Sequence, residues 1–305
     1  MTPAVLLIVF RRPETTQRVF DVIRQERPER LFIAADGPRP DRPGEAQACA
    51  ATRQIVEKVD WPCRVETKFR DRNVGCRTGI SEAITWFLTE VGEGIILEDD
   101  CLPSHDFFTL AAELLEKYRS DQRVMHIGGS SFRHGHRFTD ASYTFSRYNH
   151  GWGWATWQRA WTKMDLSMKG LEEFLVEARK TGFWDSRRER IYWSKVFRGA
   201  RDLKVDAWDY QWKYSLWKEG GLAVYPEANL VTNLGFGEGA TNTTQSDKEK
   251  GQRPWDALGP LVHPPFVLRH RRADQANFNA MYWGTPWARL VSRVRKLFRM
   301  NGTCL

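Results

Sequence analysis

Three consecutive acidic residues, Glu98, Asp99 and Asp100, end the apolar run GIIL in the stretch GIILEDDCLPSHDFF (residues 94–108). Such a run predicts a buried strand, so the carboxylates stand at its carboxyl end. Grouped carboxylates suit Mg²⁺ or Mn²⁺, which take a few carboxylates together with phosphate oxygens and waters. The alternative role is a cap on the following helix, but a cap needs only one such residue. We therefore predict a metal site here.

Two earlier segments also place polar groups at strand ends. In FRRPETT, Arg11 and Arg12 follow the apolar run 4–10 and precede a predicted helix, where they can meet a diphosphate. In AADGP, Asp36 either forms a turn or accepts a hydrogen bond from a nucleotide base. The sequence contains no GxGxxG and no GxxxxGK[ST], which excludes the dinucleotide fingerprint and the P-loop.

A third segment, HGWGWATWQRAW (150–161), combines glycines with tryptophans. Gly151 and Gly153 flank Trp152 and permit close approach of the backbone to a ligand. Trp154 either packs in the core or presents an aromatic face to the ligand, and we select it as a candidate binding residue.

The elements that must position these residues alternate between strand and helix. Strands are predicted at 4–10, 30–38, 63–70 and 93–100, helices at 11–28, 44–58, 80–91 and 106–121, and a Gly-bearing loop at 71–79. Nearly apolar strands separated by helices predict an α/β fold with a mostly parallel sheet covered on both faces. Ligands of such sheets bind outside the carboxyl ends of the strands.

The second half has a different texture, with short strands, Gly and Trp, and a helical block over 170–219. We predict one domain over 1–265, with a nucleotide-binding half (1–123) and an acceptor half (124–265), followed by a basic extension over 266–305.

The charge distribution supports this division. The formal net charge of the 305 residues is +8, and residues 266–305 hold eight Lys and Arg against one Asp. A basic amphipathic helix is predicted over 287–300, and it suits an anionic membrane surface as well as packing on the body. Five Cys without a CxxC and an N-terminus without signal-peptide features predict a cytoplasmic protein. The basic helix adds the prediction that the protein is peripheral on the inner face of the membrane.

Four segments in order, VF-RRP-ETT, AADGP, RNVGC and IILEDDCLPSHDFF, resemble a bacterial group of GT-A glycosyltransferases, some of them labelled hemolytic-protein-like. They are also similar to animal N-acetylglucosaminyltransferase I, which has an NRP turn after its first strand and an EDD followed by a proline and DFF. The resemblance covers roughly residues 4–240 and is strongest at 94–108. It implies a Rossmann-like GT-A fold with acceptor-side decoration, a nucleotide-sugar donor and a Mn²⁺ or Mg²⁺ ion.

The resemblance also implies roles for the strand-end residues. Arg12 would contact the diphosphate and Asp36 the uracil edge. Asp100 would ligate the metal, Asp99 would bind the ribose or sugar, and Glu98 the sugar hydroxyls. Many GT-A enzymes add a late His as a second metal ligand, but the polar loop that contains Glu238 and Asn242 has no His. No second protein ligand is therefore assigned.

An inverting glycosyltransferase also needs a general base for the acceptor hydroxyl. The related enzymes place an Asp beside a Trp at a helix start downstream of the EDD. In KVDAWDYQW, Asp209 follows Trp208 and is our first candidate, and Asp206 is the second. Both also fit a helix start, as N3 acid and N-cap. Asp185 in FWD is a third candidate.

We therefore expect a metal-dependent glycosyltransferase that moves a sugar from a nucleotide sugar to a glycan, lipid-linked or protein acceptor with inversion. UDP is favoured as the nucleotide by the resemblance alone. A sugar nucleotidyltransferase is an alternative, but FRRPETT lacks the Gly-rich loop typical of that class. A non-catalytic carbohydrate-binding module would retain the Trp without needing the EDD. Nucleic-acid binding has no motif beyond charge.

Overall fold

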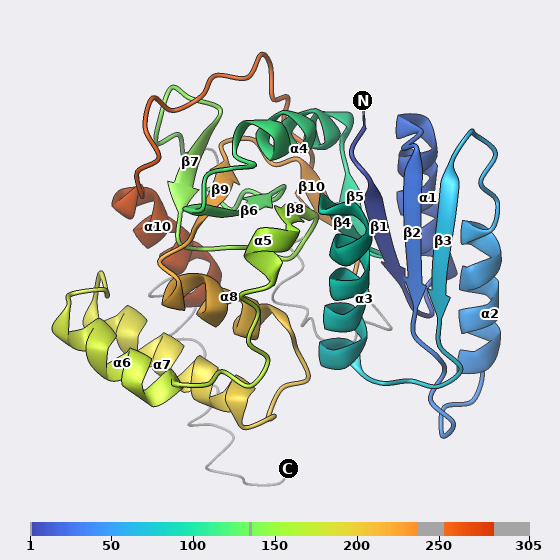
Figure 1. Ribbon diagram of the computed structural model, residues 1–305, viewed down its shortest axis with the longest axis horizontal. Coiled ribbons are helices and arrows are strands. Elements are labelled where there is room, and N and C mark those ends of the chain that lie inside the picture. Colours follow the sequence, from blue (N-terminus) through green and yellow to red (C-terminus); the bar gives the residue numbers. More distant parts are fainter. Residues whose placement is uncertain (1, 134–135, 237–252, 284–305) are drawn as a thin grey trace, which may run out of the picture.

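The computed structural model describes residues 2–133, 136–236 and 253–283 (Figure 1). In its N-terminal part, strands alternate with helices as predicted. The elements are β1 (Val5–Val9), α1 (Pro13–Glu26), β2 (Arg30–Ala35), α2 (Glu45–Val56), β3 (Arg64–Phe69), α3 (Cys76–Val91) and β4 (Glu93–Glu98). Helix α3 begins at Cys76, so the predicted loop is confined to residues 71–75.

After β4 the elements are shorter, and helices group together. They are β5 (Cys101–Pro103), α4 (His105–Lys117), β6 (Val124–Gly128), β7 (Tyr143–Ser146), β8 (Trp154–Trp157), α5 (Gln158–Trp161), α6 (Leu171–Lys180), α7 (Arg187–Arg201), α8 (Asp209–Lys218), β9 (Leu222–Pro226), β10 (Val231–Asn233), α10 (Arg271–Phe278) and the π-helical turn η2 (Asn279–Trp283).

Eight strands in the described part of the chain form one mixed sheet in the order β3-β2-β1-β4-β8-β6-β9-β7. Strands β1 to β4 are mutually parallel. Strand β8 is antiparallel to both β4 and β6, and β9 is parallel to β6, so β6 and β9 run in the direction of β4. Only β8 and β7 run the other way. The predicted α/β class with a mostly parallel sheet is confirmed.

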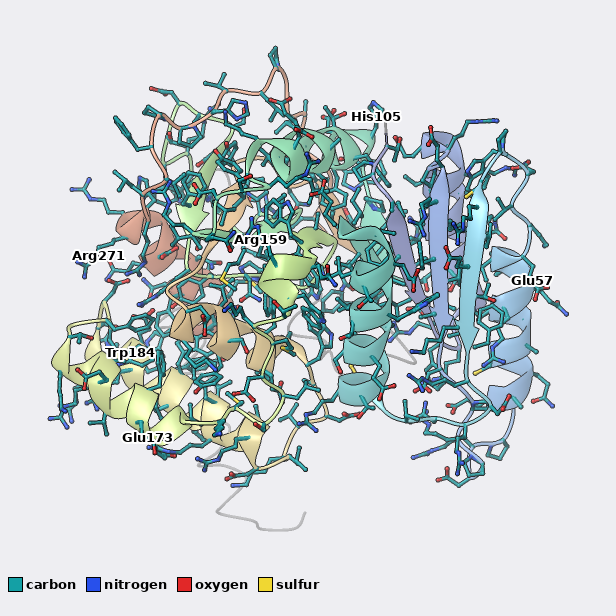
Figure 2. All side chains as sticks on the ribbon, in the orientation of Figure 1. Glu57, His105, Arg159, Glu173, Trp184 and Arg271 are labelled. Atoms are coloured by element: carbon teal, nitrogen blue, oxygen red, sulfur yellow. The ribbon has the colours of Figure 1, made fainter. Side chains whose placement is uncertain are left out.

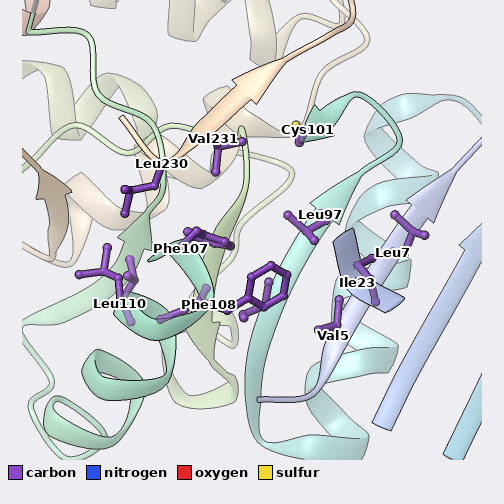
Figure 3. Close-up of a cluster of buried hydrophobic side chains, with 14 of the residues drawn as sticks. Val5, Leu7, Ile23, Leu97, Cys101, Phe107, Phe108, Leu110, Leu230 and Val231 are labelled. Atoms are coloured by element: carbon purple, nitrogen blue, oxygen red, sulfur yellow. The ribbon is translucent and has the colours of Figure 1, made fainter. Parts of the chain in front are cut away.

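Alternate residues of each strand point to opposite faces of the sheet, and both faces are apolar. Helices therefore cover both faces. Val5 and Leu7 of β1 pack with Ile23 of α1 and with Phe108 of α4 (Figure 3). Leu6 belongs to a second cluster, on the face covered by α3 and α8. With apolar side chains on both faces, charged groups can meet solvent only at the strand ends, as in the predicted metal site.

The strand order sets the order of the groups at the carboxyl edge. The ends of β3, β2, β1 and β4 follow one another, and the amino end of β8 comes next because β8 is antiparallel to β4. At a spacing of about 4.8 Å per strand, this row spans about 19 Å. It can therefore hold an elongated ligand across several strands.

The C-terminal described segment is joined to the body. The backbone N–H of His270 donates to the carbonyl of Phe145 in β7 (2.8 Å), and Ala273 and Phe278 of α10 are buried. Arg271 lies at the periphery (Figure 2). The predicted helix 287–300 lies outside the described residues, as do Glu238 and Asn242. No helix in the described ranges is long and apolar enough to cross a membrane.

Candidate functional site

A cavity of about 510 Å³ opens at the carboxyl edge of the sheet. Its wall runs from the end of β3 to the start of α8 and includes the turn η2. Seven of the eight predicted site residues line it: Arg12, Asp36, Glu98, Asp99, Asp100, Asp206 and Asp209. The structure thus brings together groups that are separated by up to about 200 positions in the sequence.

The acidic residues at the end of β4 form a crowded cluster of like charges. Burial raises the pKa of Glu98 well above its usual range, and the neighbouring carboxylates of Asp100, Asp99 and Asp209 raise it further. Burial and Asp100 raise the pKa of Asp99 to about 7, against the opposing effect of Arg12. Mutually repelling carboxylates at a cavity wall create a site at which a cation is favoured.

Arg12 is the cation that this cluster already contacts. One guanidinium nitrogen, Nη1, donates to Asp100 Oδ2 (2.6 Å) and to Asp99 Oδ1 (3.2 Å). The other oxygen of Asp99 accepts from the backbone N–H of Phe10 (3.1 Å). Arg12 holds this position because α1 begins with Pro13, so Arg12 is the N-cap at the end of β1. Arg12 thus compensates part of the charge of the cluster.

The backbone of Gly235 approaches the carboxylate of Asp100 closely. A methyl group on Gly235 would overlap Asp100 Oδ2 and would lie 3.0 Å from Asn233 Oδ1, so a bare backbone passes two oxygen atoms here. The described residues contain no group of three or more His, Cys, Asp or Glu side chains arranged to hold a metal ion. Asp100 and water would therefore need phosphate oxygens as further ligands.

Asp36, at the end of β2, holds the loop 71–75. Its carboxylate accepts from the backbone N–H groups of Gly37 (2.9 Å) and Val74 (3.1 Å), and burial raises its pKa. Gly37 is required because a Cβ there would overlap the backbone of Arg72. The loop is thereby bonded to the end of β2, and its residue Asn73 lines the cavity.

Asp206 has a structural partner that the sequence did not indicate. Its carboxylate accepts from the backbone N–H groups of Cys76 (2.9 Å) and Arg77 (3.0 Å), the first two residues of α3. The N-cap residue of α3, Gly75, has no side chain to do this. Asp206 therefore caps a helix far away in the sequence, which accounts for the start of α3 at Cys76.

Asp209 lies at the start of its own helix, where the backbone N–H groups of Asp209 and Tyr210 donate to its carboxylate. It is the first residue of α8, it lines the cavity, and burial raises its pKa, with Lys213 opposing. Its charge also acts on Glu98 across the cavity. A half-buried carboxylate of raised pKa that faces a cavity is suited to accept a proton. Of the two candidate bases, Asp209 has the better surroundings.

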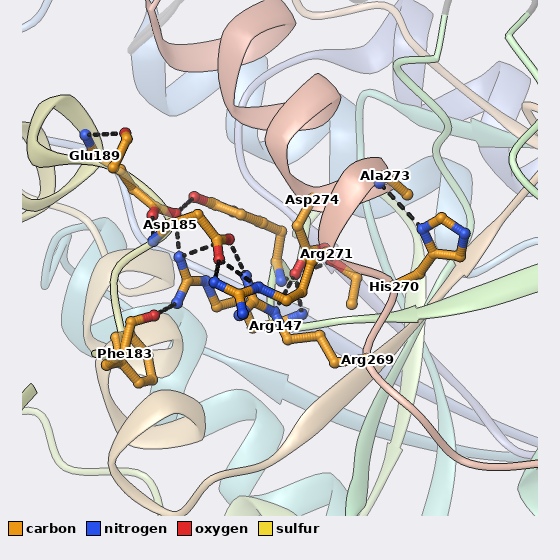
Figure 4. A network of polar contacts seen from close by, with 12 residues as sticks. Arg147, Phe183, Asp185, Glu189, Arg269, His270, Arg271, Ala273 and Asp274 are labelled. Carbon is orange, nitrogen blue, oxygen red and sulfur yellow. Dashed lines mark hydrogen bonds and ion pairs between the residues drawn. The ribbon is translucent and has the colours of Figure 1, made fainter. Parts of the chain in front are cut away.

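The third candidate, Asp185, lies outside the cavity lining. Its carboxylate is shared by Arg147, Arg269 and Arg271 (Figure 4). Arg147 is only 3% exposed and also pairs with Glu189, so this network compensates buried charge and joins the C-terminal segment to the body. The structure therefore gives Asp185 a structural role.

The prediction for Trp154 needs correction. Its side chain is fully buried, stacked on His126 (centroids 4.7 Å apart) and on Trp208 (5.5 Å). Trp154 pairs with Ile96 in the middle of the sheet, so it faces the core below α8. Trp152, two residues earlier, lines the cavity instead.

Sequence reasoning missed other lining residues. Lys68 in β3 and Arg70 just after it line one end of the cavity. The lining near α8 and η2 includes Asn149, His150, Tyr210, Met281 and Tyr282. Lys68 and Arg70 carried a signal, because they alternate along a strand that the pattern placed at the same edge. Met281 and Tyr282 carried none, since the segment was read as a basic extension.

A buried lysine supports the α8 side of the cavity. Lys213, 2% exposed, donates from Nζ to both the backbone oxygen and Oδ1 of Asn149 (2.7 Å each). Burial lowers its pKa to about 7, and Asp209, one helical turn earlier, opposes this shift. Lys213 thus fixes the position of Asn149 at the cavity wall.

No protein-family model matches the chain, and no curated protein matches its sequence. Among solved structures, HddC from Yersinia pseudotuberculosis is 9% identical, with a TM-score of 0.32, over 52% of this chain and 77% of that one. The 4-diphosphocytidyl-2C-methyl-D-erythritol synthase from Anaerococcus prevotii is 9% identical, with a TM-score of 0.33, over 64% and 99%. A UDP-glucose pyrophosphorylase complexed with UDP-glucose is 13% identical, with a TM-score of 0.24, over 48% and 62%. Likenesses this weak say nothing about the activity of this chain.

Proposed function

We propose that the protein is a metal-dependent glycosyltransferase that moves a sugar from a UDP-sugar to a hydroxyl of a glycan, lipid-linked or protein acceptor, with inversion. The observation that carries the proposal is one cavity in which Arg12, the cluster Glu98, Asp99 and Asp100, and the half-buried carboxylate of Asp209 meet. Anion-binding, cation-binding and proton-accepting groups are thereby combined at one strand edge.

The order of strands suggests how the donor lies. Asp36, Arg70 and Asn73 line the end of the cavity at β2 and β3, where the nucleoside would bind. The diphosphate would then reach the end of β1 and β4, with Arg12 as its protein cation. Asp99 and Glu98 are assigned to the hydroxyl groups of the ribose and sugar.

Asp100 is the residue that would hold the Mn²⁺ or Mg²⁺ ion, together with diphosphate oxygens and water. When bound, the ion would neutralise the charge that grows on the departing nucleoside diphosphate. Arg12 would stabilise the same charge, because its guanidinium can transfer its hydrogen bonds from the carboxylates to a phosphate.

Asp209 would accept the proton of the acceptor hydroxyl. As the acceptor oxygen bonds to the anomeric carbon, the bond to the diphosphate oxygen breaks and its electron pair leaves with UDP. One base and no protein nucleophile are needed for this displacement, which inverts the anomeric centre. The raised pKa of Asp209 favours proton acceptance.

Product analysis tests the proposal. The protein is incubated with Mn²⁺ and a panel of UDP-, GDP- and dTDP-sugars, and released nucleoside diphosphate is measured, with Asp100→Asn as control. We expect UDP release from at least one UDP-sugar and loss of release in the control. Pyrophosphate formed from UTP and a sugar 1-phosphate would instead identify a nucleotidyltransferase. Sugar binding without turnover of any nucleotide sugar would identify a binding module.

The proposal includes a cytoplasmic reaction next to the inner face of a membrane. Co-sedimentation with anionic phosphatidylglycerol liposomes tests this part, because the excess positive charge is in the C-terminal segment. Deletion of residues 286–305 should abolish co-sedimentation, and binding that survives the deletion would contradict the assignment.

A further inference from the structure

The C-terminal segment supplies part of the cavity wall. Met281 and Tyr282, both on the π-helical turn η2, line the cavity together with residues at the ends of β1 and β4. Turns of this type are rare and recur at functional sites. The segment therefore belongs to the site, although it lies some 70 positions beyond Asp209 in the sequence.

Buried polar contacts fix the position of this segment. Asp274, 1% exposed, accepts from Arg269 Nε (2.6 Å), from the backbone N–H of Arg147 (3.3 Å) and from the hydroxyl of Ser146 (Figure 4). Asn277 of α10 contacts Nε2 of His150, a cavity residue, at 3.2 Å. Helix α10 thus holds η2 in a defined place instead of allowing it to move freely.

The ring of Tyr282 is held on several sides. It lies nearly parallel to Tyr148 (centroids 5.8 Å apart, 25°) and to His150 (6.3 Å, 6°), and it meets Trp193 edge to face (4.8 Å). Burial raises the pKa of Tyr282, and the charge of Asp209 is among the further causes. A rigid aromatic side chain therefore lines the same cavity as the proposed base.

The two ends of the cavity differ in chemistry. The β3 end carries Lys68, Arg70 and Asn73, which suit a nucleotide, whereas the α8 end carries Tyr210 and Tyr282. Aromatic faces combined with a few polar groups are typical of sites for ligands that have both apolar faces and hydroxyl groups, as sugars do.

We propose that Tyr282, with Met281 and Tyr210 beside it, forms the subsite that binds the acceptor sugar and presents its hydroxyl to Asp209. This inference rests on the proposed function, because the donor must occupy the β3 end for the acceptor to lie at the α8 end. It makes Tyr282 a residue that determines acceptor binding and has little part in donor binding.

The test separates transfer from donor hydrolysis. A UDP-sugar that the protein hydrolyses is used as donor, and p-nitrophenyl glycosides of glucose, galactose, mannose and N-acetylglucosamine are used as acceptors. For Tyr282→Ala we expect kcat/KM for the acceptor to fall by about tenfold or more, mainly through KM, because the aromatic contact is lost. Donor hydrolysis and calorimetric UDP affinity should stay within about twofold.

Two further variants distinguish binding from packing. Tyr282→Phe retains the ring and should keep transfer close to the level of the unaltered protein. Trp283→Ala is the matched control, because Trp283 is on the same turn, packs on Phe278 (centroids 6.0 Å apart) and does not line the cavity. It should leave the KM for the acceptor unchanged.

Several outcomes would overturn the inference. These are equal losses of transfer and donor hydrolysis in Tyr282→Ala, an unchanged acceptor KM, the same loss in Trp283→Ala, or no effect of any glycoside on the unaltered protein. Failure of the unaltered protein to turn over any nucleotide sugar refutes the proposed function itself. An active protein that is indifferent to Tyr282→Ala refutes this inference alone.

Discussion

Replacing Asp206 and Asp209 one at a time should separate stability from catalysis. Asp206 accepts hydrogen bonds from the backbone N–H groups of Cys76 and Arg77 at the start of α3. Loss of a helix cap typically costs about 1 kcal/mol, up to about 2 kcal/mol. For a protein of this size, each kcal/mol lowers Tm by about 2–4 °C. We expect Asp206→Ala to lower Tm by about 2–8 °C, and Asp206→Asn to lower it less because Asn also caps.

Asp209→Asn should behave in the opposite way. Burial raises the pKa of Asp209 above its unfolded value, so the ionised carboxylate disfavours the folded state at neutral pH, and the effect vanishes below the unfolded pKa of about 3.9. The neutral Asn should leave Tm at pH 7.5 equal or higher. Loss of a general base should lower turnover by about 10²–10⁴-fold.

The assay combines thermal unfolding at pH 7.5 and pH 4.5 with initial rates of UDP release in the presence of the acceptor. Asp206→Ala should retain turnover within about tenfold of the unaltered protein, since its loss removes no proton acceptor. The reasoning is refuted if Asp209→Asn turns over normally, or if Asp206→Ala abolishes turnover while Tm is unchanged.

Three further predictions follow from particular contacts. Gly37→Ala should displace the loop that contains Arg72, with a stability loss of about 1–3 kcal/mol and weaker UDP binding by calorimetry. An unchanged affinity for UDP would show that this loop does not contact the nucleoside. Burial lowers the pKa of Lys213 to about 7 from an unfolded value of about 10.4, so the folded protein binds fewer protons and its stability should rise between about pH 7 and 10. Lys213→Met should flatten that rise in denaturant titrations, and an equal slope in both proteins would contradict the burial of a neutral lysine. Asp274→Ala should lower stability by about 3 kcal/mol and expose the bond after Arg269 to trypsin, because buried donors lose their acceptor; protection equal to that of the unaltered protein would argue against the anchor.

The pattern of apolar runs predicted the strands of the first half well, because a buried strand in a parallel sheet is apolar on both sides. Residues 4–10 became β1 and residues 93–100 became β4 with its acidic end. The same logic placed Arg12, Asp36 and Asp100 at one edge, which the cavity lining confirms. The ligand roles of these residues stay predictions.

Contacts between distant segments could not be predicted in the same way. The capping of α3 by Asp206 depends on the packing of two segments that are 130 positions apart. Trp154 was misjudged because the preceding Gly153 says nothing about which face of a central strand a side chain takes. Tyr282 was missed because charge alone characterised its segment, while its anchor, Asp274, was the one acidic residue among eight basic ones.

Calorimetry of UDP with the unaltered protein, with and without Mn²⁺, tests the central claim most directly. The account predicts binding of UDP that is stronger by about tenfold or more with Mn²⁺, because the cluster at Asp100 repels a diphosphate unless a cation intervenes. The Mn²⁺ effect should disappear in Asp100→Asn. Absence of UDP binding under both conditions, or a Mn²⁺ effect of the same size in Asp100→Asn, would contradict the account.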